Sequence, residues 1–324
     1  MQFLKQVLVQ DESQAASTVR TEDLPVNPLS HISISLRALN DTGTITNFTV
    51  LSALLGFITK VEVLFQGSAI ISGSLDDLAR LMAVLLSRGP MAPRITSVNN
   101  EIRGVTIIIP LGRRCFNPLE CFPAVRRGEL QLQITSGAAT TGIDTVTLQI
   151  ETVELLAAAP KQYMKATTIS KTPSATGDHD VDLPIGNLLA GALLFGTTAP
   201  TTASWNASLG QLRLLVDNVE AYYARANWET LHGELALRCQ ANAQQSEHVH
   251  VSDVGAAYAQ FQNTHLNAVN TDFLNNYAFL DLDPAKDDSY LLDTKGRARI
   301  HTRITADVAD AIRIIPVELV AVAG

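Results

Sequence analysis

The chain repeats a series of short segments in the same order, and this repetition constrains its fold more than any single motif does. Each half contains a strand-like apolar run, a short link and a helix-like run. The helix-like runs follow Ser74 and Asn227, residue types that cap helices by accepting bonds from the first backbone N–H groups. Aligning Ser74 with Asn227 also aligns Leu78 with Leu231, since both pairs are 153 residues apart (227 − 74 and 231 − 78). The sequence therefore predicts two copies of one domain.

Further segments match on both sides of these helices. The matched ranges are 53–55 with 192–194, 61–65 with 214–216, 105–110 with 277–282, 128–135 with 296–303, and the tripeptide Val-Glu-Leu at 153–155 with the same tripeptide at 317–319. Short apolar runs recur by chance in a chain that is 46% hydrophobic, so the common order of the matches matters more than any one match. The alternative is a β-rich chain without duplication.

Several segments alternate apolar and polar residues, a pattern that predicts strands with one face in the core. These segments are 32–36, 130–134, 146–150 and 300–304. Short strands separated by turns are typical of sandwiches and barrels, and about eight strands in two sheets form a jelly roll. We therefore expect an all-β fold with two tandem eight-stranded jelly-roll sandwiches, at residues 30–158 and 159–324, and short helices in their loops.

Residues 1–29 precede the first predicted sandwich and are expected to form an amphipathic arm. The apolar side chains of Met1–Ser13 would share one face of a short helix; they are Phe3, Leu4, Val7 and Leu8. The polar residues that follow do not resemble a signal-peptide cleavage region. We expect a helical arm that docks on a neighbouring subunit, rests on a membrane surface or packs on its own domain.

Length, charge and cysteine content narrow the class of protein. A chain of 324 residues exceeds the usual size of one core, which favours two domains of about 150 residues each. The net charge of −8 argues against a nucleic-acid surface, because phosphate recognition needs clustered Lys and Arg. The cysteines, Cys115, Cys121 and Cys239, are odd in number and lack paired spacing, which fits a reducing compartment or indifference to redox state.

Two clusters could in principle bind a metal ion. His248 and His250, followed by Asp253 and His265, could place imidazoles on one side of a strand. The carboxylates of the second cluster could hold Ca²⁺ through oxygen ligands; they are Asp281, Asp283, Asp287 and Asp288. A polar loop and a solvated acidic turn are the simpler interpretations. No catalytic or cofactor motif is present, so we assign no catalytic, cofactor-binding or metal-binding residue and expect no cofactor.

Two successive jelly rolls in one acidic, cysteine-poor chain, each with a capped helix between late strands, resemble the double jelly-roll major capsid proteins of tailless icosahedral viruses. The likeness is nearest to members from membrane-containing bacteriophages and covers about residues 30–322. It implies a structural protein of the virion, made in the host cytoplasm, and not an enzyme. Three copies would form a pseudo-hexameric trimer that tiles the shell.

The resemblance also implies partners. They are the chain itself, neighbouring trimers, other capsid proteins such as penton or minor proteins, and an internal membrane surface contacted by Met1–Ser13, without direct recognition of nucleic acid. The main alternative is a tandem β-sandwich carbohydrate-binding or adhesin module, and a glycoside-processing enzyme is more distant. Exposed aromatic residues in a groove would favour the module, yet the only tryptophans are Trp205 and Trp228, and Trp228 is expected to pack in a core.

Overall fold

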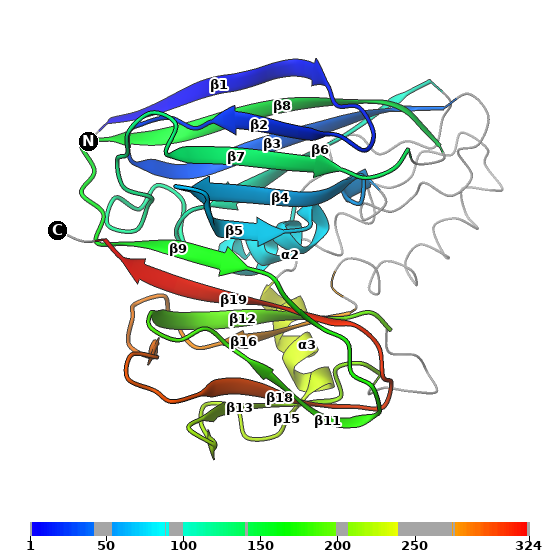
Figure 1. Ribbon diagram of the computed structural model, residues 1–324, viewed down its shortest axis with the longest axis vertical. Coiled ribbons are helices and arrows are strands. Elements are labelled where there is room, and N and C mark those ends of the chain that lie inside the picture. Colours follow the sequence, from blue (N-terminus) through cyan, green and yellow to red (C-terminus); the bar gives the residue numbers. More distant parts are fainter. Residues whose placement is uncertain are drawn as a thin grey trace. The chain divides into compact units, whose positions relative to one another are not determined.

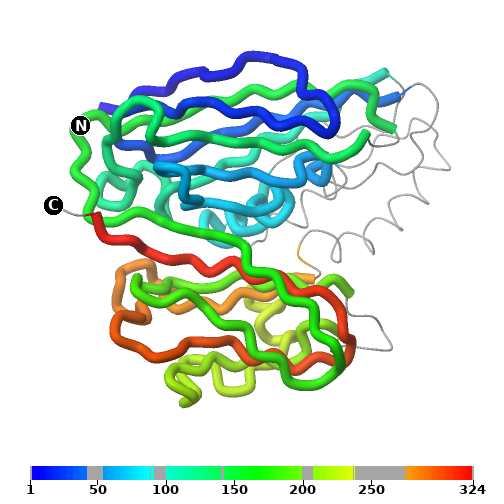
Figure 2. The backbone as a smooth tube through the Cα atoms, in the orientation of Figure 1, coloured from blue at the N-terminus to red at the C-terminus, as the bar shows by residue number. Residues whose placement is uncertain are grey.

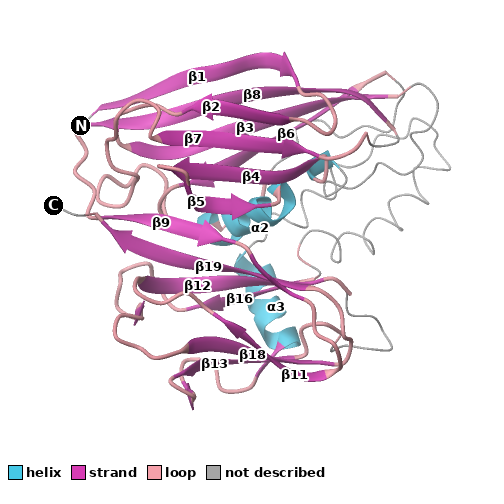
Figure 3. Ribbon diagram, viewed as in Figure 1, coloured by secondary structure: helices cyan, strands magenta, loops and turns pink. Residues whose placement is uncertain are grey.

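The structure is a computed structural model that describes residues 2–41, 54–87, 89–90, 100–139, 142–198, 207–238, 274 and 276–322. These residues are mostly strands (Figure 3). They form two compact units, one ending at Tyr163 and the other beginning at Met164. The predicted boundary, between residues 158 and 159, lies five residues earlier (163 − 158).

In the described part of the first unit, the strands β1 to β8 and the helix α2 can be assigned (Figure 1). The elements are β1 (Gln2–Ser13), β2 (Val19–Asp23), β3 (Leu29–Asn40), β4 (Ile58–Phe65), β5 (Ser68–Gly73), α2 (Leu75–Leu86), β6 (Ile102–Pro110), β7 (Leu130–Ser136) and β8 (Ile143–Leu156). The strands are ordered β1-β8-β3-β6 in one sheet and β5-β4-β7-β2 in the other. If the strands are lettered B to I along the chain, these orders read B-I-D-G and F-E-H-C, the arrangement of a jelly roll.

The second unit repeats this strand arrangement, and its path can be followed in the backbone trace of Figure 2. Its elements are β9 (Gln162–Thr167), β10 (Ile169–Lys171), β11 (Gly177–Asp182), β12 (Leu188–Gly196), β13 (Gln211–Val216), β14 (Val219–Glu220), β15 (Ala226–Asn227), α3 (Trp228–Arg238), β16 (Tyr277–Asp281), β17 (Leu292–Asp293), β18 (Ile300–Ala306) and β19 (Ile312–Ala321). The orders β9-β19-β12-β16 and β11-β18-β13-β14 correspond to B-I-D-G and C-H-E-F. The predicted fold of two tandem jelly rolls is confirmed.

The repeat extends to single residues. The Val-Glu-Leu tripeptides lie on β8 and β19, the last strand of each unit, and both glutamates are buried. Glu154 accepts a hydrogen bond from Asn27 Nδ2 at 2.7 Å, and Glu318 accepts one from Asn187 Nδ2 at 2.6 Å. Each bond connects the last strand of its unit to the residues just before strand D of the jelly roll, which is β3 in the first unit and β12 in the second. The buried Asn–Glu pair therefore has the same place in both jelly rolls.

One predicted match is wrong. Residues 54–55 are helical, whereas residues 192–194 lie within β12. The two segments share apolar composition, and a run this short has no periodicity that separates a helix from a strand. The match was therefore one of composition alone.

The helices confirm the predicted packing of their apolar faces. Ser74 Oγ accepts a hydrogen bond from Asp77 N at 3.0 Å and caps α2. Leu78 on α2 and Leu231 on α3 are both buried. Asn227 directly precedes α3, but its Oδ1 accepts a hydrogen bond from Gln211 Nε2 instead. None of the helices in the described ranges has the length and apolar composition of a membrane-spanning segment.

Replacing Ser74 with Ala is expected to destabilise the first unit by about 1 kcal/mol, because the N–H of Asp77 loses its acceptor. Chemical denaturation followed by circular dichroism would measure the change. The variant Ser74→Asp keeps an acceptor at the cap and is expected to stay close to the wild type. Equal losses in the two variants would contradict a capping role for Ser74.

The expected N-terminal helix is wrong, because Gln2–Ser13 forms strand β1. This strand pairs antiparallel with β8 from Gln2↔Leu156 to Ser13↔Thr147, with irregular register on both sides of Val9. The spacing of its apolar residues fits one face of a helix. Its partner strand, β8, lies far along the sequence, and no local pattern reveals that the two segments pair. The segment belongs to the first jelly roll and is not a separate helical arm.

Candidate interaction surfaces

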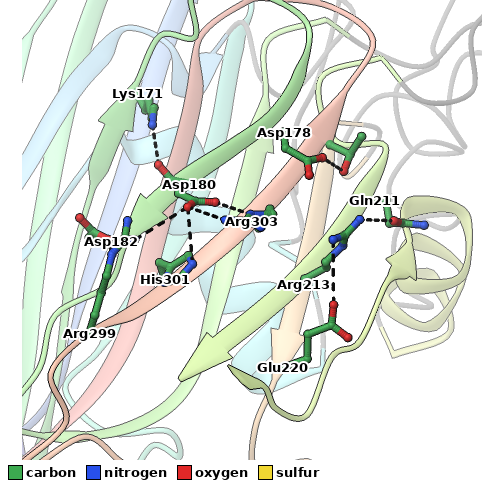
Figure 4. A network of polar contacts seen from close by, with 11 residues as sticks. Lys171, Asp178, Asp180, Asp182, Gln211, Arg213, Glu220, Arg299, His301 and Arg303 are labelled. Carbon is green, nitrogen blue, oxygen red and sulfur yellow. Dashed lines mark hydrogen bonds and ion pairs between the residues drawn. The ribbon is translucent and has the colours of Figure 1, made fainter. Parts of the chain in front are cut away.

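The sheet β11-β18-β13-β14 has one apolar face and one charged face. On β18, Ile300 and Ile304 belong to the core of the second unit, so His301, Arg303 and Thr305 point to the opposite face. Three aspartates of β11 lie across from β18 in register: Asp178↔Thr305, Asp180↔Arg303 and Asp182↔His301. The strands thus place a row of carboxylates beside a row of basic side chains (Figure 4).

These charges neutralise each other within the chain. Arg303 donates from Nε and Nη2 to the two carboxylate oxygens of Asp180, at 2.6 and 2.9 Å. Arg299 Nε donates to Asp182 Oδ1 at 2.6 Å, and Lys171 Nζ donates to the backbone oxygen of Asp180. The hydrogen bond from Arg303 is the largest influence that holds the pKa of Asp180 below its ordinary value. This face is therefore a self-paired ionic surface and has little free charge to offer a partner.

The first unit exposes a small aromatic group. Phe116, half exposed at 50%, meets Phe3 edge to face with 5.5 Å between ring centroids. The His31 ring also lies edge to face with Phe116, with 5.1 Å between ring centroids. Burial, and secondarily the charge of Lys5, lowers the pKa of His31 to about 4, so this imidazole is neutral near pH 7. Two apolar rings therefore stay at the surface beside a buried neutral histidine.

The loop that carries Phe116 is fixed by a buried ion pair. Arg113 Nη2 donates to Glu120 Oε2 at 2.7 Å, and Arg113 Nε lies 3.1 Å from Oε1. The Arg113 backbone N–H also donates to Glu120 Oε1. Ser30 Oγ accepts a bond from Phe116 N at 2.8 Å, although Phe116 has a left-handed backbone with φ of 63°. The loop thus presents Phe116 and the exposed Leu119 in one fixed conformation.

Strand β1 forms an edge of its sheet and exposes apolar side chains on both faces. Phe3, Leu4 and Val7 are all exposed. Ion pairs flank them, Lys5 with Glu151 at 2.5 Å and Arg37 with Asp11 at 2.7 Å. Exposed apolar groups on an edge strand mark a surface suited to contact with another protein.

The two clusters that were considered as metal ligands, but not assigned as such, can be located only in part. His248 and His250, with Asp253 and His265, lie outside the described residues. In the acidic turn, Asp281 Oδ1 accepts from Asp283 N at 2.9 Å and Asp287 Oδ1 accepts from Ser289 N at 3.0 Å. These carboxylates hold the turn through its own backbone N–H groups. No group of three or more metal-ligating side chains gathers within the part of the chain that the structure describes.

Of the tryptophans and cysteines noted in the sequence, Trp228 and Cys121 are buried and Cys115 is half-buried. Trp228 packs in the core of the second unit and stacks on His232 with ring centroids 4.5 Å apart, as expected for a core residue. Trp205 and Cys239 lie outside the described residues. Cys115 and Cys121 form no disulfide, and burial raises the pKa of each thiol to about 11, which makes them poor nucleophiles near pH 7.

The charged face and the Phe116 loop were not predicted from the sequence. The alternation Asp178-His179-Asp180-Val181-Asp182 is a readable strand signal with three carboxylates on one side. Nothing comparable marks Phe116, because its exposure depends on how the loop folds over Ser30.

Comparison with known proteins identifies the fold. No family model and no curated protein matches the chain. A chain from the atomic structure of Sulfolobus Turreted Icosahedral Virus matches with a TM-score of 0.69 and 15% identity, over 99% of this chain and 91% of that one. The major capsid protein P2 of bacteriophage PM2 matches with a TM-score of 0.63 and 11% identity, over 99% and 98%.

A chain of the PBCV-1 virus capsid matches with a TM-score of 0.59 and 8% identity, over 98% of this chain and 94% of that one. Identities this low establish a shared fold and leave function to be argued separately. The chain therefore has the double jelly-roll fold of these viral capsid proteins.

Proposed function

We propose that this chain is the major capsid protein of an icosahedral virus and that its copies associate as pseudo-hexameric trimers. The observation that carries the proposal is the occurrence of the same eight-strand order twice. The likeness to capsid chains also extends over at least 98% of this chain and 91% of each of the three viral chains described above. The likeness therefore includes both jelly rolls and not one of them alone.

Duplication gives a geometric reason for trimers. Three subunits with two similar jelly rolls each would place six similar units around an axis, so that a trimer fits a position of hexagonal symmetry. The agreement of the two units in strand order and in the buried pairs Asn27–Glu154 and Asn187–Glu318 supports such pseudo-equivalence. The two units would serve as the two domains of one subunit.

The partners of the proposed shell follow from this arrangement. Each trimer contacts further copies of itself in the virion, and other capsid proteins, such as a penton protein, fill positions where six similar units do not fit. The exposed residues Phe3, Leu4 and Val7 on β1, with Phe116, supply apolar surface for contacts between subunits. A contact with an internal membrane at this end of the chain would use these strand side chains.

The mass of the purified protein in solution tests the proposal. Three chains of 34.9 kDa each give a trimer of about 105 kDa, which light scattering after size exclusion would detect. Electron microscopy of the same fraction should show particles with a sixfold outline. A monomer at every protein concentration tested would contradict the proposal.

A further inference from the structure

His301 occupies an unusual position within the charged face of the second unit. Its side chain has 0% exposure although it points away from the apolar core. Among the described residues, neither ring nitrogen has a hydrogen-bond partner. Its Nε2 lies 3.6 Å from Asp180 Oδ2, beyond hydrogen-bond distance. The imidazole therefore fills space as a neutral ring.

Charged groups approach His301 from several elements. Asp180 and Asp182 face it from β11, Arg303 lies two residues further along β18, and Arg299 directly precedes that strand. Further out on the same network, Lys171 from β10 binds the backbone of Asp180, and Arg213 on β13 pairs with Glu220 on β14 at 4.0 Å; the network is shown in Figure 4. Protonation would thus make His301 a fourth cation near Asp180, beside Arg299, Arg303 and Lys171. The carboxylate oxygens of Asp180 already accept hydrogen bonds from Arg303.

Burial is the largest influence on the pKa of His301 and lowers it, because an imidazolium without water loses its solvation. Arg299 and Arg303 lower it further, whereas Asp180 and Asp182 raise it. The balance leaves the pKa below its ordinary value. His301 therefore binds a proton less readily in the folded unit than in the unfolded chain.

We propose that His301 is an acid-sensitive switch of the second jelly roll, neutral near pH 7, whose protonation loosens strand β11 from β18. Among the strands that the structure describes, β11 is the edge of its sheet and pairs only with β18, so no second described strand holds it. Charging the ring also disturbs the Asp180–Arg303 pair that links the two strands. The switch is a property of one unit and does not depend on the proposed capsid role.

The direction of the pH effect follows from linkage. An unfolded histidine has a pKa of about 6.5, and that of folded His301 is lower. The stabilisation from neutral His301 is therefore complete above pH 6.5 or so and is lost as the pH falls below it. Between the unfolded and folded pKa values, one proton raises the unfolding equilibrium constant by up to about tenfold per pH unit.

Urea unfolding of the full chain, followed by tryptophan fluorescence, tests the switch. Both tryptophans, Trp205 and Trp228, fall within the sequence of the second unit, so the signal reports on that unit. The wild type would be compared with His301→Leu and His301→Gln at about pH 7.5 and about pH 5.5. Acidification should raise the unfolding equilibrium constant of the wild type. We expect that rise to be smaller in both variants, by a factor of up to about ten per pH unit.

The control variant is Thr305→Val, which alters the same face of the same strand without removing a group that titrates in this range. It should keep the pH dependence of the wild type. His232, whose pKa is also lowered by burial, is present in every variant and cancels in the comparison. The proposal is overturned if both His301 variants follow the wild type, if Thr305→Val behaves as they do, or if neither His301 variant folds at about pH 7.5.

Discussion

Replacing Leu231 with Asp is expected to unfold the second unit. Leu231 has 3% exposure and belongs to the core cluster that contains Trp228. A carboxylate at this position loses the apolar contacts of leucine and enters the core without a partner, at a combined cost of more than about 5 kcal/mol. Because whole domains are stable by only about 5–15 kcal/mol, this change removes most or all of the stability. Tryptophan fluorescence should shift to the wavelength of solvent-exposed indole.

The same helix supplies a matched control. Leu237 also lies on α3 but is 72% exposed, so Leu237→Asp is expected to change stability by no more than about 0.5 kcal/mol. The two variants make the same chemical substitution in one helix and differ in burial. An unchanged urea midpoint for Leu231→Asp would show that this face of α3 does not pack in the core of the second unit.

The strand pattern was predictable because the inner and outer faces of these sheets differ in polarity. Segments 130–134 and 300–304 alternate in sequence, and the structure buries Leu130, Leu132 and Ile134 while their neighbours are partly exposed. The positions of α2 and α3 were predicted from the cap-type residues that precede them, Ser74 and Asn227. The duplication then favoured two similar domains, whereas the order of the strands within each sheet is known only from the structure.

The N-terminal strand could not be identified in the same way. Phe3, Leu4, Val7 and Leu8 have the spacing of a helical face, and β1 buries only Val9, so inward and outward positions scarcely differ in polarity. What makes the segment a strand is its pairing with β8, where Lys5 meets Glu151. Such long-range pairing leaves no mark in the local sequence.

The charged face shows the same limit. Its aspartates alternate visibly along β11, but the partner of Asp180 is Arg303, 123 residues away in the sequence. The histidine at the centre looks like one of several polar strand residues until the packing of its neighbours is known. The register between β11 and β18 decides which charges meet. A register shift of one residue would place the aspartates against the core.

Removing the carboxylate of Glu120 is expected to destabilise the first unit by about 3–5 kcal/mol. Glu120 and Arg113 have side-chain exposures of only 4% and 6%. In Glu120→Ala the buried guanidinium loses the counter-charge that this carboxylate provides, while the cost of removing Arg113 from water remains. For a unit of this size the melting temperature should fall by roughly 6–20 °C, measured by circular dichroism.

An exposed ion pair of the same unit provides the comparison. Arg37 and Asp11 are 49% and 47% exposed at their side chains, so Asp11→Ala is expected to cost less than about 1 kcal/mol. Water solvates Arg37 after the change, whereas water reaches Arg113 poorly. If the two variants melt at the same temperature, the Arg113–Glu120 pair does not stabilise the unit. A loss confined to Glu120→Ala would show that this buried pair fixes the loop on which Phe116 is displayed.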